Sequence, residues 1–448
     1  MKTIFISSFQ AHMSRNILST DALTILQARE DVRVVILVPD YKRDYFERNF
    51  MSSNTVIEGA PLYQASKTRA GLFFKRLGIF LFNTKTARAK RKYQYYCEGK
   101  YIYYAWGMIL GFLGRSWTIR GMVRVLDYRF SPKNFFDELF MRYAPDLVFA
   151  PDVQNENDVA LMHASRRWRV PIIGMIRSWD NPTQRTLRVF PDRLLVGSET
   201  LKEEVERIYR YPSSQIVVCG NPHYDRYLTG PQEKREAFFE RFGLDPAKRL
   251  ILYAPFGDML IRHNDVDEYV MGILAGLGTQ VLVRFPPDEK VNLPHFSKPP
   301  HMAYDIPGVG FKKDEFGDRE ISREDDQRLI DSLIYADVVI SGPTSIPLDA
   351  SLLDKPAIMA HLYPSPRGFC GSVYNFWFAH IEKFLATDGV AYATDKEELI
   401  SAVKHVLADP QRHSEGRARI RAMWFSHADG NAGARLAAAL LSFPSRLS

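Results

Sequence analysis

Residues 336–350 read ADVVISGPTSIPLDA. The apolar run at 338–341 predicts a buried strand, and Gly342 and Pro343 predict a tight turn. Thr344 and Ser345 stand where a helix over 345–353 is expected to begin. Free N–H groups at a helix start bind anions, and hydroxyls add donors. Residues from about 250 to 360 are therefore expected to form a nucleotide-diphosphate-binding α/β domain centred on Ser341–Asp349. The alternative is that Ser345 only caps the helix.

Short apolar runs alternate with helical patterns along the chain, as in parallel strands covered by helices on both faces. Helices are expected at Arg15–Arg29, Asn134–Tyr143, Asn157–Trp168, Glu199–Tyr209, Gln232–Phe242 and Arg323–Tyr335. Strands are expected at Thr3–Ser8, Val32–Val38, Leu147–Ala150, Pro171–Ile176, Arg193–Val196, Gln215–Cys219, Leu250–Ala254, Gln280–Arg284, Val338–Ser341 and Pro356–Ala360.

A chain of 448 residues suits two domains of roughly 200 residues each. We expect an α/β protein with two Rossmann-like, doubly wound domains, 1–222 and 223–425, which face each other across a cleft. Residues 426–448 are predicted to form a C-terminal helix that packs back on the first domain.

The 336–350 stretch resembles the donor-site signature of GT-B glycosyltransferases and of two related families. These relatives are the CDP-glycerol glycerophosphotransferases and the non-hydrolysing UDP-GlcNAc 2-epimerases. The resemblance assigns Ser341, Gly342, Thr344 and Ser345 to the donor diphosphate. It assigns Asp349 to the nucleotide ribose, where a glutamate is usual.

Two flanking stretches carry the same resemblance. Residues 252–258, LYAPFGD, resemble the first strand and phosphate-facing loop of the GT-B donor domain, which adds Pro255 and Phe256 to the donor site. Residues 192–199, DRLLVGSE, and 218–222, VCGNP, resemble the end of the acceptor domain and the hinge.

One position departs from the glycerophosphotransferase pattern, which usually has a histidine after the second donor-domain strand. Residues 283–287 read VRFPP, with proline at that place. Arg284 is expected either to neutralise a donor phosphate or to form a salt bridge at the strand end.

Three polar loops follow strands of the first domain, at 7–16, 151–156 and 177–183. They are expected at one edge of the sheet, where ligands bind in open α/β folds. A base must remove the proton of an acceptor hydroxyl, and His12 and Asp180 are the candidates. The alternatives are a solvated loop histidine and a turn residue before Asn181-Pro182. The expected substrate-binding residues are Arg15, Asp152, Glu156, Arg177, Trp179 and Asn181.

Residues 69–133 contain fourteen Lys or Arg residues and two acids, although the whole chain carries a net charge of only +7. Apolar and aromatic residues lie among these cations, as in segments that bind an anionic membrane surface. The alternatives are a helical insertion packed on the first domain and a nucleic-acid-binding surface, and we expect no nucleic-acid partner.

No resident metal is expected, because the resemblance implies that helix dipoles and basic side chains stabilise the leaving diphosphate. Asp265-Val266-Asp267 is interpreted as a solvated turn. The three cysteines have no zinc-ligand spacing, and the N-terminus enters a strand directly, which predicts a cytoplasmic protein.

The sequence therefore predicts a metal-independent GT-B glycosyltransferase that uses a UDP- or CDP-linked sugar. Its acceptor is expected to be a lipid-linked or cell-surface polysaccharide at the inner face of the cell membrane, as part of cell-envelope polysaccharide biosynthesis. The alternatives are a CDP-glycerol- or CDP-ribitol-type polyol-phosphate transferase, a nucleotide-sugar 2-epimerase, and a non-catalytic nucleotide-binding component of a polysaccharide assembly.

Overall fold

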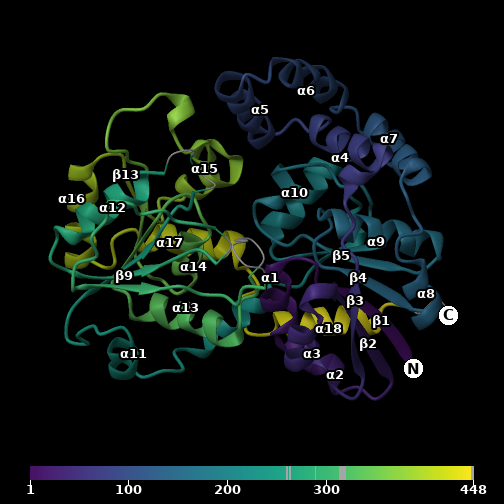
Figure 1. Cartoon of the computed structure of the whole chain (residues 1–448), viewed down its shortest axis with the longest axis horizontal. Coiled ribbons are helices and arrows are strands. Elements are labelled where there is room, and N and C mark those ends of the chain that lie inside the picture. The colour runs from purple at the N-terminus through teal and green to yellow at the C-terminus, as the bar shows by residue number, and fades with distance from the viewer. Residues whose placement is uncertain (259–260, 262–263, 288, 312–318, 445–448) are drawn as a thin grey trace. The chain divides into compact units, whose positions relative to one another are not determined.

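The computed structural model describes residues 1–258, 261, 264–287, 289–311 and 319–444 (Figure 1). The chain divides into two compact units. The first unit comprises Met1–Asp225 and Ser426–Ser448, and the second comprises Arg226–Phe425. The last four residues of the predicted C-terminal helix lie outside the described residues.

The first unit is built on a seven-stranded parallel sheet in the order β3-β2-β1-β4-β5-β6-β7. The strand order reverses between β1 and β4, so the loops after these strands leave the sheet in opposite directions. The edge strand β3 was not predicted. The strands are β1 Lys2–Ser7, β2 Val32–Pro39, β3 Thr55–Ala60, β4 Leu147–Ala150, β5 Ile172–Met175, β6 Arg193–Val196 and β7 Ile216–Val218.

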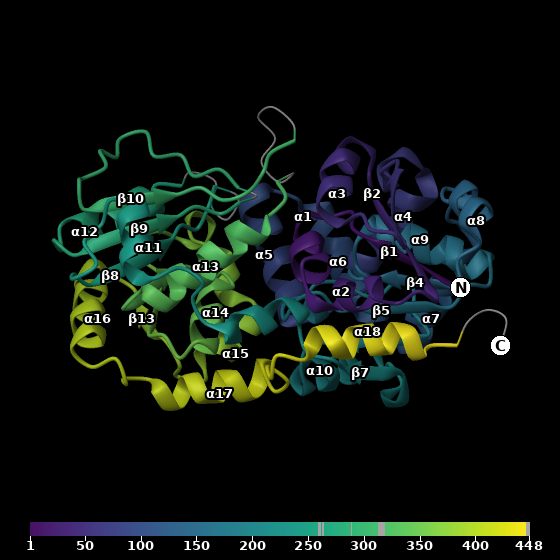
Figure 2. The ribbon, with the colours of Figure 1, turned by 90° about the horizontal axis from the view of Figure 1, so that it is seen from below.

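Helices cover this sheet, and one of them comes from the far end of the chain. Figure 2 shows α18 (Ala432–Ser442) lying beside α2 (Asp21–Gln27), and Leu436 and Leu440 share a buried cluster with Leu23. Lys2 donates to the carbonyls of Leu440 and Phe443 at 2.8 and 2.6 Å, which satisfies the end of α18. The other covering helices are α3 Arg43–Phe50, α8 Asp137–Tyr143, α9 Glu156–Arg167 and α10 Glu199–Tyr209.

The prediction of one helix over Arg15–Arg29 was wrong. The chain forms α1 at Ala11–Met13, a π-helical turn at Ser14–Leu18 and then α2. Thr20 separates them, because its hydroxyl accepts a hydrogen bond from the Ala22 N–H at 3.3 Å and caps a new helix.

The basic segment forms four helices that extend away from the sheet of the first unit (Figure 1). Arg91 on the second helix links it to the end of the first and to the third, since its buried guanidinium donates to the carbonyls of Phe82 and Gly107 and its Nε donates to the Ala87 carbonyl at 3.2 Å. Gly111 leaves room for the same guanidinium. We call residues 69–130 the helical insertion. Its helices are α4 Arg69–Phe80, α5 Lys85–Glu98, α6 Tyr101–Leu113 and α7 Trp117–Phe130.

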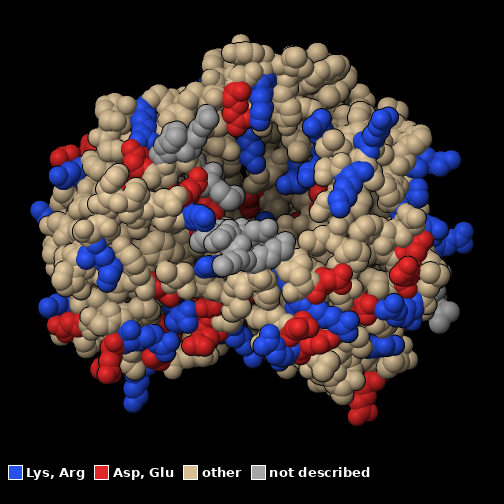
Figure 3. Space-filling model, in the orientation of Figure 1, with Lys and Arg blue, Asp and Glu red and all other residues tan. Residues whose placement is uncertain are grey.

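Many large apolar side chains of the helical insertion face outward, and Phe112 on α6 is 67% exposed. The surface over α6 is largely without charged side chains (Figure 3). Within the described residues, no helix combines the length and apolarity that a membrane span requires. The exposed apolar side chains are Phe73, Tyr96, Tyr101, Ile102, Trp106, Met108, Ile109, Phe112, Leu113, Trp117, Met122, Val125, Leu126 and Phe130.

The second unit contains a six-stranded parallel sheet in the order β10-β9-β8-β11-β12-β13, which reverses between β8 and β11. The edge strands β10 and β13 were not predicted. The strands are β8 Leu250–Ala254, β9 Gln280–Arg284, β10 Met302–Asp305, β11 Val338–Ser341, β12 Ala357–Ala360 and β13 Ala391–Ala393. The helices are α11 Arg235–Arg241, α12 Val266–Ala275, α13 Arg323–Tyr335, α14 Ile346–Leu352, α15 Ala379–Leu385, α16 Lys396–Ala408 and α17 Ser414–Trp424.

Buried Asp127 anchors α7 to the core of the first unit. Its carboxylate accepts two hydrogen bonds from Arg188 at 2.8 and 2.9 Å, and Arg188 also pairs with Glu156 at 2.6 Å. His163 lies beside this cluster, with Nε2 3.8 Å from Asp127, and its ring stacks on Tyr128. Burial lowers the pKa of His163 to about 4, so the imidazole is neutral at pH 7.

We expect acid to weaken this junction. The folded pKa of His163 lies below the ordinary value of 6.5, so its contribution to stability is complete above that pH and is lost as the pH falls towards 4. Between pH 7 and pH 5 the free energy of unfolding should fall by about 2 kcal/mol more in the wild type than in His163→Phe. Denaturant unfolding at the two pH values measures the difference. His427→Phe is the control. An equal fall in His163→Phe and in the wild type would show that His163 is not the cause of the loss of stability.

Candidate functional site

In the second unit, the loops after β8 and β11 meet where the strand order reverses. Ser341 pairs with Ala254 in the sheet register, and its hydroxyl donates to the Ala254 carbonyl at 3.0 Å. Because the Ser341 proton is used there, Thr344 donates to Ser341 across 2.9 Å. Thr344 also accepts from the Ile346 N–H at 3.3 Å. A chain of hydroxyls thus shapes the predicted diphosphate loop.

Close packing fixes the rest of this loop. Phe256 is buried, and its ring lies so near Gly342 that a Cβ there would approach it to 2.4 Å. Pro255 is also buried. Any side chain at position 342 would push the two loops apart, so glycine is required by the neighbouring ring.

Ser345 and Asp349 occupy different surroundings. Ser345 is exposed and its side chain makes no capping hydrogen bond, so the alternative that it only caps the helix is wrong. Asp349 lies in the first turn of α14 and is 4% exposed. The assignments of Ser345 to a phosphate and of Asp349 to a ribose stay predictions.

Asp267 corrects the interpretation of Asp265-Val266-Asp267 as a solvated turn. Its side chain is fully buried, and its carboxylate accepts from the Tyr253 hydroxyl at 2.6 Å, the Phe256 N–H at 2.8 Å and the Gly257 N–H at 3.2 Å. Burial raises the pKa of Asp267, while these donors oppose the rise. The backbone donors of the loop after β8 therefore bind Asp267 within the unit.

Arg284 ends β9 in a buried ion pair. Its guanidinium pairs with Asp305 and donates to the Asp325 carbonyl at 2.7 Å. Burial lowers the pKa of Arg284. The geometry favours the salt-bridge alternative over a phosphate contact, since both partners occupy the guanidinium.

In the first unit, three loops after adjacent strands meet at Arg177. Its guanidinium donates to Gln10 at 2.8 Å and lies 3.5 Å from the Asp152 carboxylate. Gln10 follows β1, Asp152 follows β4 and Arg177 follows β5. The expectation that these loops share one edge of the sheet is therefore correct.

A buried acid beside this cluster was not predicted. Asp158 on α9 accepts from the Ser7 hydroxyl, and burial raises its pKa well above the ordinary range, with the nearby Asp152 charge adding to the rise. The buried Ser8 Oγ and Arg177 Nε have no hydrogen-bond partner among the described residues. Such atoms are costly unless a ligand or water satisfies them, which favours a polar ligand here.

The turn after β5 brings Trp179 and Asp180 to a half-buried position. Asp180 accepts a hydrogen bond from Gln184. Asn181 is buried and donates to Gln154 at 3.2 Å, so its amide holds the turn.

The other predicted residues of the first unit lie on α1, on the π-helical turn and on α9. His12 lies in α1, and Arg15 donates to Asn16 at 3.0 Å within the π-helical turn. Glu156 pairs with Arg188 at the base of the helical insertion, which engages its carboxylate in anchoring α7.

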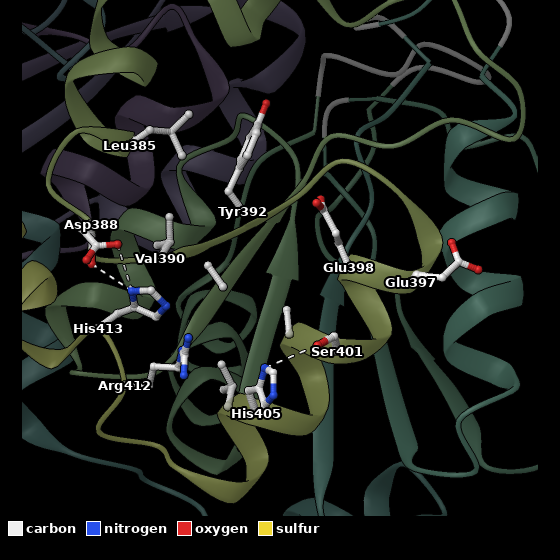
Figure 4. A pocket seen from close by; sticks show the side chains of 13 residues that line it. Leu385, Asp388, Val390, Tyr392, Glu397, Glu398, Ser401, His405, Arg412 and His413 are labelled. Carbon is white, nitrogen blue, oxygen red and sulfur yellow. Dashed lines mark hydrogen bonds and ion pairs between the residues drawn. The ribbon is translucent and has the colours of Figure 1, made fainter.

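A cavity of about 750 Å³ lies elsewhere in the second unit, between β13, α15 and α16 (Figure 4). His413 lies 3.1 Å from Asp388 at its rim, and Ser401 lies 3.4 Å from His405. None of the predicted site residues lines it. Among the described residues there is no group of three or more His, Cys, Asp or Glu side chains that is able to hold a metal ion.

A family model described as CDP-Glycerol:Poly(glycerophosphate) glycerophosphotransferase matches residues 177–442, more than half of the chain. The chain belongs to this family. The match begins at Arg177 and includes the whole second unit with the Ser341–Asp349 loop. Glycerophosphotransferases were among the relatives inferred from the 336–350 stretch, and that inference is confirmed. A search of curated proteins finds no match.

Solved structures show the same fold as this glycerophosphotransferase family member. The UDP-GlcNAc 2-epimerase from Neisseria meningitidis, bound to UDP-GlcNAc, has a TM-score of 0.57 at 11% identity, over 99% of this chain and 100% of that one. A putative UDP-N-acetylglucosamine 2-epimerase from Listeria monocytogenes has a TM-score of 0.55 at 14% identity, over 99% of this chain and 96% of that one. The glycotransferase of kitacinnamycin has a TM-score of 0.52 at 12% identity, over 98% of each chain. The predicted GT-B class with two Rossmann-like domains is confirmed.

Asp267→Ala should destabilise the second unit by about 3 kcal/mol. The substitution leaves the Tyr253 hydroxyl and two backbone N–H groups without their acceptor, and an unpaired buried donor costs about 1–3 kcal/mol. Hydrogen exchange of residues 250–258 and thermal unfolding measure the effect. Glu240→Gln, on the exposed face of α11, is the control. Wild-type protection of the loop in Asp267→Ala would show that the carboxylate does not hold it.

Proposed function

We propose that the chain transfers a polyol phosphate from a CDP-linked donor to a hydroxyl acceptor at an anionic membrane surface. The family match over residues 177–442 carries this proposal, because it covers the whole predicted donor unit and one loop of the predicted acceptor site.

The proposed reaction breaks the bond between the bridging oxygen and the β-phosphorus of the donor. The acceptor oxygen attacks this phosphorus and forms a new phosphodiester, while CMP leaves with the bridging oxygen. The exposed Ser345 hydroxyl would donate to a phosphate oxygen, and Asp349 would bind the ribose. The Thr344 hydroxyl would hold the shape of the loop through its hydrogen bond to Ser341. No metal is invoked for this step.

The first unit would supply the acceptor side. Asp180 is the proposed base, since it is a half-buried carboxylate in the loop after β5 that also carries Arg177, whose guanidinium suits an anionic acceptor group. Trp179 offers a ring on which a sugar or polyol can pack, and Asp152 holds Arg177. The Ser8 hydroxyl, without a partner in the described chain, would contact the acceptor. His12 is the second candidate base.

The helical insertion would bind lipid. Its exposed apolar side chains suit the acyl boundary, and the exposed cations suit anionic headgroups. Each cation near such a surface is worth about 1 kcal/mol. As part of this proposal, the protein is peripheral on the inner face of the cell membrane. The exposed cations are Arg69, Arg76, Lys85, Arg88, Lys92, Lys100, Arg115 and Arg129.

Sugar transfer is the second candidate, and a specific observation favours it. The resemblance expects a histidine after β9, but Pro286 follows that strand, and Arg284 is held by Asp305. Sugar transfer would break the bond between the anomeric carbon and the donor oxygen and release a nucleoside diphosphate. Epimerisation leaves the helical insertion without a role, and a non-catalytic protein would release no nucleotide.

The nucleotide released identifies the reaction. With CDP-glycerol and a washed membrane fraction of the native cells as acceptor source, we expect CMP, measured by liquid chromatography. Thr344→Ala/Ser345→Ala should lower the rate at least tenfold, because the Ser345 donor to the phosphates of the nucleotide and the Thr344 hydroxyl that shapes its loop are both lost.

The matched control for this experiment is Ser401→Ala in the cavity of the second unit. UDP release from UDP-GlcNAc, without CMP from CDP-glycerol, would establish sugar transfer in place of the proposed reaction. Release of neither nucleotide would contradict both.

Ile109→Asp/Phe112→Asp should lower binding to vesicles containing phosphatidylglycerol at least tenfold. Burying one such side chain is worth about 1.5–3 kcal/mol, and a tenfold change corresponds to about 1.4 kcal/mol. Vesicle sedimentation measures binding. Met51→Asp replaces an equally exposed apolar residue outside the helical insertion and should bind like wild type. Unchanged sedimentation of the double variant would show that α6 does not contact the membrane.

A further inference from the structure

The start of α5 lies against the turn that carries Asp180. Thr84 donates to the Thr183 carbonyl, and Thr86 donates to the Thr183 hydroxyl at 3.0 Å. Thr86 and Thr183 are buried. The helical insertion is therefore packed directly on one of the polar loops after β5.

One turn further along α5, Lys90 reaches the same loop. Its Nζ donates to the Gln184 side-chain oxygen, and the Gln184 amide donates to the Asp180 carboxylate. The Gln184 amide thus bridges the two groups: its oxygen accepts from the Lys90 ammonium, and its nitrogen donates to the Asp180 carboxylate.

The backbone of the turn is fixed from its other side. Gln154 donates to the carbonyls of Asn181 and Arg185 at 3.1 Å each, and the Tyr209 hydroxyl donates to the Pro182 carbonyl at 3.0 Å. These contacts come from the loop after β4 and from α10. They hold the main chain but do not touch the Asp180 carboxylate.

The surroundings of Lys90 lower the pKa of its amine. Burial lowers the pKa of Lys90 to about 8, Asp180 acts in the opposite direction, and Arg185 lowers it further. An ordinary exposed lysine would stay almost fully charged up to about pH 9. Lys90 therefore loses its proton, and its attraction for Asp180, near pH 8.

We propose that Lys90 is a positioning residue for Asp180: an ammonium carried by the helical insertion orients this carboxylate through Gln184. The proposal rests on the acceptor role given to Asp180 above. It adds a function to the helical insertion beyond lipid binding, because α5 then completes the acceptor loop.

The link itself is tested by nuclear magnetic resonance, without any substrate. In protein labelled with 13C at lysine Cε, the Lys90 resonance is assigned by its loss in Lys90→Arg. We expect it to titrate near pH 8 and to titrate lower in Asp180→Asn, which removes the carboxylate that favours the charged amine. An unchanged titration in Asp180→Asn overturns the proposal.

The consequence for the reaction is tested with the nucleotide-release assay. Lys90→Met should lower kcat at least tenfold with little change in the donor KM, and Lys90→Arg should restore much of the rate. Wild-type kcat should fall above about pH 8, as Lys90 loses its charge, and this fall should move to higher pH in Lys90→Arg. Lys67→Met, an exposed lysine of the first unit, is the control.

The outcomes separate this inference from the proposed function. If Lys90→Met keeps the wild-type kcat and pH profile, Lys90 does not position Asp180. If the wild type releases no nucleotide from any donor, the proposed function fails, while the titration of Lys90 in Asp180→Asn still decides whether the link exists. Circular dichroism and hydrogen exchange of residues 85–98 establish that Lys90→Met remains folded.

Discussion

In both sheets the chain builds outward from a central strand, first in one direction and then in the other. The reversal lies between β1 and β4 in the first unit and between β8 and β11 in the second. Because all strands are parallel, their carboxyl ends and the loops that follow them share one edge of the sheet. This constraint explains why Gln10, Asp152 and Arg177 meet although they are far apart in sequence, and why Ser341 reaches Ala254.

Local patterns were sufficient to predict the central strands and the Ser341–Ser345 loop. These strands are short, continuous apolar runs, and the turn chemistry of Gly342-Pro343 follows directly. The edge strands β3, β10 and β13 were missed because TVIEGA, MAYD and AYA are less uniformly apolar and have neighbours on one side only.

The chemistry of single acids depended on contacts that the sequence does not display. Asp267 looks like a turn residue, yet β8 supplies one donor to it, the Tyr253 hydroxyl, and the loop after β8 supplies two backbone N–H donors. Asp158 follows Asn155 and Glu156 in a polar stretch, but the helix buries it against Ser7. Arg284 was expected at a strand end, and only the position of Asp305 on the neighbouring strand decides its partner. Lys90 lay among fourteen cations, with nothing to distinguish it from the others.

The helix α18 has a consequence for how the protein is made. The core of the first unit contains Leu23 from near the start of the chain and Leu436 and Leu440 from near its end. During synthesis, the sheet of the first unit emerges before the second unit but lacks one of its covering helices until residue 442 has been made. The second unit, whose residues 226–425 are contiguous, is complete earlier. The unit that begins first is therefore finished last, and the apolar face of α2 remains uncovered during that interval, when it is open to chaperones or to aggregation.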